Sequence, residues 1–263
     1  KAGVWLMPKP AAMTTFSPEL ESDADLGRAI DQLRRLRLQR TLTGPVYIAN
    51  VFRTLAHMGR YPWHETNGDT PLSRELAEKL VRRRAQPGRG GRYNAIGALQ
   101  GTERGVEAAV RDVAEALDST GKLTFTSASD IDRFERRGRM LSRVPKLSER
   151  GRRMVATASV ARSGLSIFQG VPSDQALAIS RWRLRSPVKG ICVDPTAEGC
   201  GLYWVAPVCP ANGTDVNRCL RIIEDRVLSD GFEPLIRIAM TTDRSLFLTT
   251  LIAFDRRHQG ERQ

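Results

Sequence analysis

The fold is decided by four successive segments: GLYWVA (201–206), TDVNRCLRIIEDRVL (214–228), LIRIAM (235–240) and LFLTTLIAF (246–254). The first, third and fourth are short, apolar and rich in β-branched or aromatic residues, which is typical of strands. The second segment repeats apolar residues at helical spacing, namely Val216, Leu220, Ile223 and Val227. The run therefore predicts a strand, a helix with one apolar face, and two further strands.

An earlier part of the chain shows a similar order of elements. Residues 93–99 and 122–126 are strand-like, and residues 102–117 between them have helical periodicity. The two β-α-β units, at about 91–127 and 200–255, predict a ferredoxin-like fold of the α+β class. We expect an antiparallel sheet with helices packed mainly on one face.

The remaining segments predict shorter elements around these two units. Asp23 is the expected N-cap of a helix that spans residues 23–40. Other expected strands lie at 2–8 and 46–49, and other expected helices at 51–58, 73–84, 129–142 and 173–184. Residues 164–172 and 187–199 carry the glycine and proline signals of loops.

Composition narrows the class of protein. The net charge is +12, but the basic residues are scattered and aromatic residues, only 6% of the chain, are not interleaved with them. This pattern argues against nucleic-acid binding. No apolar run reaches the roughly 20 residues of a membrane-spanning helix. The four cysteines lack C-x-x-C spacing and have no nearby histidine, so we expect no metal site.

The sequence offers little for a self-contained catalyst. The chain has three histidines and no G-x-G-x-x-G or G-x-x-x-x-G-K-[ST] nucleotide-binding motif. No arrangement of a nucleophile with a histidine and a carboxylate can be argued from the spacing. We therefore name no catalytic residue in this chain.

Five pieces of the chain occur in an order and spacing that carry a family resemblance. They are GVWLMP (3–8), AIDQLR (29–34), RYNAIGAL (92–99) with Gly101, CGLYW (200–204) through Pro207, and GFEP (231–234) followed by two strands. The chain resembles the cap, or substrate, domain of the vanillyl-alcohol oxidase and para-cresol methylhydroxylase (4-cresol dehydrogenase) family of FAD-linked oxidases.

The resemblance implies a function for the protein of which residues 1–263 form the substrate-cap segment. FAD is expected to be bound mainly by a flavin-binding domain outside this chain, so the segment alone should be inactive. The expected reaction is oxidation of a para-substituted phenol by hydride transfer from its benzylic carbon to flavin N5. Cytochrome c is the expected electron acceptor if the enzyme is a dehydrogenase, and a homodimer is compatible with the resemblance.

The last strands are the expected wall of the substrate pocket, because a cap must exclude water and hold the phenol ring. Alternation places either Arg237, Ala239 and Thr241 or Ile236, Ile238 and Met240 on one face, and the sequence does not decide between them. The substrate-binding candidates are Trp204, Arg237, Ala239 and Thr241. For each residue the alternative is ordinary sheet core.

The resemblance places the flavin beside the final strand pair, with Phe247 and Thr249 as cofactor-binding candidates. Some members of the family attach FAD covalently through a histidine or tyrosine in this region. The matching segment here is Leu246-Phe247-Leu248-Thr249, which contains neither residue. This departure argues against a covalent flavin link through the cap.

The sequence leaves two alternative functions open: the first changes the substrate, and the second changes the class of protein. One is a related cap that serves a hydroxy acid, which arginine side chains able to bind a carboxylate would favour. The other is a non-enzymatic, basic binding module of ferredoxin-like fold, which steeply salt-dependent binding to nucleic acid would favour.

Overall fold

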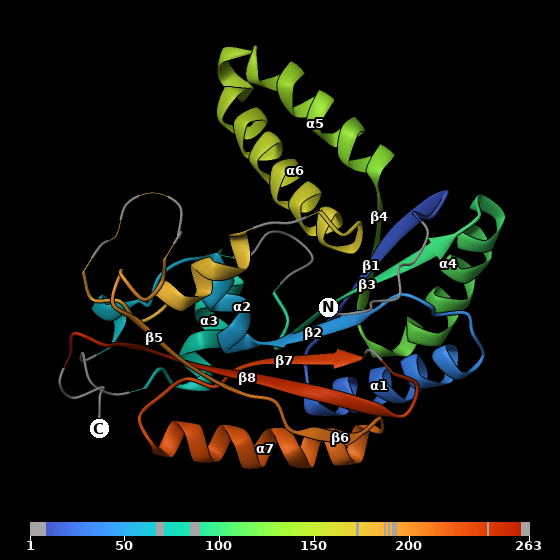
Figure 1. Ribbon diagram of the computed structural model, residues 1–263. Helices are drawn as coiled ribbons and strands as arrows, with labels where there is room; N and C mark the ends of the chain where they lie inside the picture. Colours follow the sequence, from blue (N-terminus) through green and yellow to red (C-terminus); the bar gives the residue numbers. More distant parts are fainter. Residues whose placement is uncertain are drawn as a thin grey trace, which may run out of the picture.

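A single antiparallel sheet organises the chain. The computed structural model describes residues 9–66, 71–84, 90–171, 174–186, 188, 190, 194–240 and 242–258. The eight-stranded sheet has the order β4-β1-β3-β2-β7-β8-β5, with β6 also paired to β8, and every pairing is antiparallel (Figure 1). The strands are β1 (Ala12–Leu20), β2 (Val46–Asn50), β3 (Tyr93–Gly101), β4 (Lys122–Ser127), β5 (Cys200–Val205), β6 (Val208–Pro210), β7 (Leu235–Met240) and β8 (Ser245–Asp255). The predicted α+β class and the antiparallel sheet are confirmed.

Three long helices cover one face of this sheet. They are α1 (Asp23–Leu38), α4 (Glu103–Leu117) and α7 (Gly213–Ser229); in Figure 1, α7 runs along the bottom, and α1 and α4 lie at the right. Their apolar faces form the main core with alternate residues of the strands, such as Phe16, Ile48 and Ile238. The helical spacing read from the sequence therefore locates the main core.

Two further helices lie on the opposite face at one end of the sheet. They are α2 (Val51–Met58) and α3 (Arg74–Arg84), and a second core joins them to Leu235, Leu251 and Ala253. These three strand residues alternate with those of the main core, so they point to the other side of the sheet. The helices are thus mainly on one face, as expected, with α2 and α3 as the exceptions.

A helical hairpin of α5 (Ala128–Ser142) and α6 (Ser148–Phe168) projects from the sheet (Figure 1). Helix α6 continues through residues 164–168, where the sequence predicted a loop, so that prediction is wrong. Nothing lies within 4 Å of a Cβ added at Gly164, and one glycine costs a helix only about 1 kcal/mol. The helical segment predicted at 173–184 is instead a 3-10 helix, η4 (Asp174–Arg181).

The connections contain three other 3-10 turns: η1 (Trp63–Glu65), η2 (Asp118–Thr120) and η3 (Pro145–Leu147). The expected strand at 2–8 lies outside the described residues. Strand β1, which the sequence did not predict, lies between β3 and β4. Its pairing with β3 is interrupted at Ser17 and Pro18, since proline has no N–H to donate.

Helix starts follow the capping chemistry of short polar side chains. The α1 N-cap is Ser22, whose hydroxyl accepts a hydrogen bond from the Asp25 N–H at 3.1 Å. Asp23 is the first helical residue, so its assignment as the cap was wrong by one position. An acidic residue there still suits the positive end of the helix dipole.

The α4 cap provides a test of helix stability. The Thr102 side chain accepts a hydrogen bond from the Gly105 N–H at 3.2 Å. Thr102→Ala is expected to lower the free energy of unfolding by about 1 kcal/mol, because one N–H of the first turn loses its partner. Urea unfolding measures the change. Thr102→Ser keeps the hydroxyl and is the control, so equal losses in the two variants would contradict the capping role.

Candidate functional site

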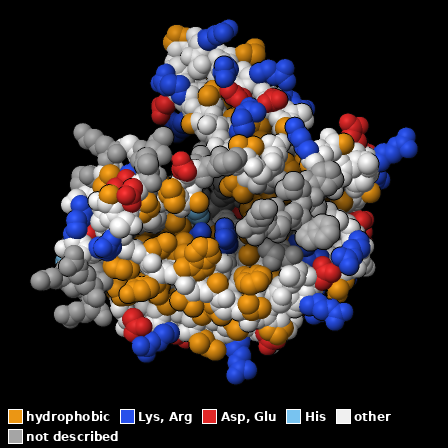
Figure 2. All heavy atoms as spheres, viewed as in Figure 1, with side chains coloured by type: hydrophobic (Ala, Val, Ile, Leu, Met, Phe, Trp, Pro, Cys, Tyr) orange, Lys and Arg blue, Asp and Glu red, His pale blue; other side chains and the backbone are white. Residues whose placement is uncertain are grey.

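The candidate site is the face of the sheet that α1, α4 and α7 do not cover. It lies between α2 and α3 at one side and the α5–α6 hairpin at the other (Figure 1). We call it the open face and define it by two rows of paired residues. One row is Ile96, Tyr47, Ala239, Phe247 and Val208, and the next is Asn94, Ala49, Arg237 and Thr249. Figure 2 shows hydrophobic side chains over the lower part of this view and a central hollow that contains basic side chains.

The structure decides the alternation that the sequence left open. Ile236, Ile238 and Met240 are buried in the main core, whereas Arg237 and Ala239 point to the open face. Helices cover the side of β7 that carries Ile236, Ile238 and Met240. Only the side chains on its other side, such as that of Arg237, can reach a ligand. Thr241 lies outside the described residues.

The cofactor candidates share this face. Phe247 is paired with Ala239 and Thr249 with Arg237, so all four side chains point the same way. Trp204 is paired with Leu251, lies on the same side of the sheet and is 67% exposed. Ala239 and Thr249 are buried, so Arg237, Phe247 and Trp204 are the more accessible members of the set.

Three residues that the sequence analysis did not single out complete the open face. The Arg237 guanidinium lies 5.0 Å from the centre of the Tyr47 ring, and the Tyr47 ring lies 5.9 Å from that of Phe168. Arg53, near the start of α2, is only 5% exposed, and its Nη1 donates to the Leu235 carbonyl at 3.4 Å. Arg53 could have been identified from the sequence, because it is a charged residue within a mainly apolar helical segment. Phe168 could not, because the sequence predicted a loop at its position.

The two arginines form a region of uncompensated positive charge. Burial, and secondly the charge of Arg237, lowers the pKa of Arg53 to about 10. Both Nε atoms are buried without a hydrogen-bond partner. Neither side chain forms an ion pair with any residue that the structure describes. Two like charges in a partly buried site are costly unless an anion accompanies them.

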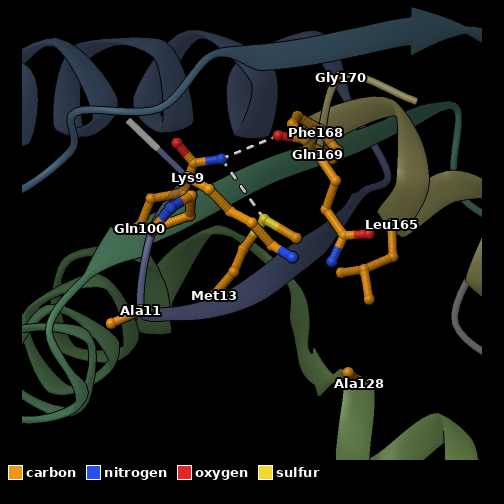
Figure 3. Close-up of a pocket in the computed structure, with 10 residues that line it drawn as sticks. Lys9, Ala11, Met13, Gln100, Ala128, Leu165, Phe168, Gln169 and Gly170 are labelled. Atoms are coloured by element: carbon orange, nitrogen blue, oxygen red, sulfur yellow. Dashed lines mark hydrogen bonds between the residues drawn. The ribbon is translucent and has the colours of Figure 1, made fainter. Parts of the chain in front are cut away.

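A cavity of about 390 Å³ lies beside the open face, at the base of the hairpin (Figure 3). Its wall includes Met13 and Gln100 from the sheet and Phe168 from the end of α6. The Gln100 Nε2 atom donates to the Phe168 carbonyl at 3.1 Å, which fastens the end of α6 to β3. Phe168 therefore lines the cavity and also lies beside Tyr47 of the open face.

The open face suits one part of a flavin. Aromatic side chains can cover a flat ring by stacking, and arginine side chains can donate hydrogen bonds to its oxygens. Phe247 and Thr249 cannot form the histidine or tyrosine link known for the family, and their neighbours Leu246 and Leu248 are buried in the main core.

The described ranges contain neither a candidate metal site nor a membrane-spanning helix. No group of three or more histidine, cysteine or acidic side chains there could hold a metal ion. No helix in the same ranges is long and apolar enough to cross a membrane.

Comparisons with known proteins give relatives across the whole chain. No protein-family model matches. The chain is 31% identical, over 98% of its length, to a 1'-carboxy-chondrochloren decarboxylase from Chondromyces crocatus, and covers 46% of that protein. It is also 31% identical, over 57% of its length, to the flavoprotein subunit of 4-cresol dehydrogenase [hydroxylating] from Pseudomonas putida, and covers 29% of it.

Solved structures show the same fold. A substrate-bound p-cresol methylhydroxylase matches 98% of the chain with a TM-score of 0.71 and 19% identity, and the chain covers 42% of it. The 4-ethylphenol oxidase from Gulosibacter chungangensis, in complex with isoeugenol, matches 97% with a TM-score of 0.72 and 17% identity, also over 42% of its chain.

The chain thus spans less than half the length of each of these relatives. Neither the hydroxy-acid cap nor the basic binding module is favoured by them. The expected family resemblance is confirmed by sequence and by fold. In sequence and in fold, the chain resembles members of the vanillyl-alcohol oxidase and para-cresol methylhydroxylase family of FAD-linked oxidases.

Proposed function

We propose that this chain is the substrate cap of an FAD-dependent oxidoreductase that oxidises para-substituted phenols. The observation that carries the proposal is the open face, where Arg237, Phe247 and Trp204 share one side of the sheet with Tyr47. FAD is bound mainly by a domain outside this chain, and the open face covers the flavin ring. The two β-α-β units at about 91–127 and 200–255 form the frame of the cap.

The residues of the chain bind and shield the reactants in this proposal. When bound, FAD accepts a hydride from the benzylic carbon of the phenol. Phe247 and Tyr47 hold aromatic rings by apolar contact and exclude water from them. Arg237 orients an oxygen-bearing group, since its guanidinium donates in a fixed geometry. The buried side chains of Ala239 and Thr249 keep the floor of the site flat.

Anaerobic mixing of the FAD-loaded, full-length protein with 4-ethylphenol tests the proposal. We expect the absorbance of oxidised flavin to disappear, and to disappear more slowly when the benzylic hydrogens are replaced by deuterium. An unchanged flavin spectrum with a series of 4-alkylphenols would refute the proposed reaction. Bleaching without an isotope effect would place another step before the hydride transfer.

The nature of the flavin link gives a second prediction. Because the final strand pair offers Phe247 and Thr249 in place of a histidine or tyrosine, the cap should not bind FAD covalently. Acid precipitation should therefore release the flavin into the supernatant. Flavin that stays in the denatured pellet and that mass spectrometry locates on a peptide of the cap would contradict this.

The electron acceptor and the assembly state belong to the same proposal. A dehydrogenase would pass electrons to cytochrome c, and an oxidase would pass them to oxygen. Measuring cytochrome reduction and oxygen uptake with the same phenol separates the two, and light scattering of the purified protein tests the homodimer. The decarboxylase relative is named for a carboxylated compound, which makes a carboxyl group on the substrate worth testing.

A further inference from the structure

The strongest unexplained feature of the molecule is the charge at the centre of the open face. Two arginines from different elements, Arg53 of α2 and Arg237 of β7, are close enough for their charges to interact. Arg53 is only 5% exposed, and its Nε atom has no hydrogen-bond partner. A chain rarely buries a cation in this way unless a counter-charge arrives from elsewhere.

The described parts of the chain supply no such counter-charge. Other arginines of low exposure have partners within the fold: Arg74 pairs with Glu224 and Arg181 with Glu198, and buried Arg37 donates to the Gly44 and Met240 carbonyls. Arg237 contacts the Tyr47 ring, which offsets part of its charge, but it makes no hydrogen bond to a described residue. The pair therefore has donors available for an anionic ligand.

The surroundings define the chemical class of that ligand. Tyr47 and Phe168 form an aromatic wall, Tyr47 lies against the Arg237 guanidinium, and Phe168 also lines the cavity at the hairpin base. An aromatic ring fits against the wall, and a carboxylate fits the planar donor geometry of arginine. Figure 2 shows basic side chains at the central hollow of this view, and Arg53 is only 5% exposed.

We propose that Arg53 and Arg237 form a carboxylate-binding site on the open face, so that the phenol taken by this protein carries a carboxyl group. This inference rests on the proposed function, because it names the substrate class of the same site. The carboxylate receives hydrogen bonds from both guanidinium groups and neutralises part of their charge. The phenol ring lies against Tyr47 and Phe168.

Two ligands of similar shape, one anionic and one neutral, test the proposal. 4-Hydroxybenzoate and 4-hydroxybenzamide have similar shapes, and neither has a benzylic C–H, so neither can be oxidised at that position. Isothermal titration calorimetry on the FAD-loaded, full-length protein at neutral pH gives both dissociation constants. We expect the benzoate to bind about 10- to 100-fold more tightly than the amide, since charge-assisted hydrogen bonds are stronger than neutral ones.

Substitution of the arginines should remove this preference. Arg237→Gln and Arg53→Gln are each expected to reduce the ratio of the two dissociation constants by about tenfold or more. Arg111→Gln, on the exposed surface of α4, removes the same charge elsewhere and should leave the ratio unchanged. Because Arg53 is buried, Arg53→Lys and a circular-dichroism spectrum check that its variants fold.

The possible results separate the proposal from the proposed function. If the glutamine variants lose affinity equally for the acid and the amide, the proposal is overturned, and the arginines are assigned to the phenol oxygen or to the flavin. A preference that persists in both glutamine variants would overturn it as well. If 4-ethylphenol reduces the flavin but the parent protein binds 4-hydroxybenzoate no more tightly than 4-hydroxybenzamide, only the carboxylate site is refuted. Failure of every phenol to bind or to reduce the flavin would refute the proposed function itself.

Discussion

Replacing Glu233 by leucine is expected to lower the free energy of unfolding by about 3–5 kcal/mol, because it removes the acceptor of two buried hydrogen bonds together with the charge that faces Arg183. Glu233 is 1% exposed, and its Oε1 accepts hydrogen bonds from the Tyr61 hydroxyl at 3.0 Å and from the Leu72 N–H at 2.8 Å. The Arg183 Nη1 lies 3.6 Å from its Oε2. The network joins the segments around α2 and α3 to the start of β7, so it supports one wall of the open face.

Glu233→Gln is the matched control for this change. Burial raises the pKa of Glu233, against the opposing effects of Arg183 and of its hydrogen bonds, so keeping the carboxylate ionised costs free energy. Glutamine keeps an acceptor for the Tyr61 hydroxyl and the Leu72 N–H without that cost. We expect a much smaller loss for Gln than for Leu in urea unfolding followed by tryptophan fluorescence. Similar losses would show that charge, and not the hydrogen bonds, holds the segments together.

The second large effect is expected at the crossing of α1 and α7. A Cβ added at Gly213 would lie 2.5 Å from the Gly27 Cα atom and 2.5 Å from its carbonyl oxygen. These are backbone atoms, so no side chain can rotate away, and the helices would have to separate. Gly213→Ala should therefore destabilise the protein by about 1–3 kcal/mol, although alanine is the better helix former.

Gly164 provides the comparison for this prediction. It also lies in a helix, but a Cβ there would meet nothing within 4 Å. Gly164→Ala should leave stability unchanged or raise it by up to about 1 kcal/mol, as helix propensity alone predicts. Thermal unfolding of both variants beside the parent protein gives the test. Stabilisation by Gly213→Ala would mean that α1 and α7 are not in close contact.

Much of the sheet and its helices could be predicted from periodicity and chain breakers. Segments with regular apolar spacing, such as 46–49, 102–117 and 235–240, match β2, α4 and β7 within one or two residues. Strand β1 was missed because Pro18 interrupts its pattern, and its place between β3 and β4 depends on long-range pairing. Residues 164–168 of α6 were missed because the glycine and proline signals of residues 164–172 predicted a loop over the whole stretch.

Only part of the candidate site could be predicted from the sequence, because the rest depends on how helices pack against the sheet. Side chains along β7 alternate between the two faces of the sheet. Which face is open depends on where α1 and α7 pack, and this tertiary contact cannot be read from the sequence of β7. The sequence analysis named Arg237 but not Arg53, since their proximity requires α2 to fold over the end of β7. The contact of Phe168 with Tyr47 likewise depends on where the hairpin ends.

The central claim is that the open face covers the flavin and its phenol. An experimental structure of the full-length protein, with FAD and 4-hydroxybenzoate bound, tests it most directly. We expect the flavin ring and the phenol to contact the open face, with Phe247 and Tyr47 near the rings and Arg237 near the carboxylate. A structure in which another protein segment covers these residues, and the flavin lies elsewhere, would contradict the account.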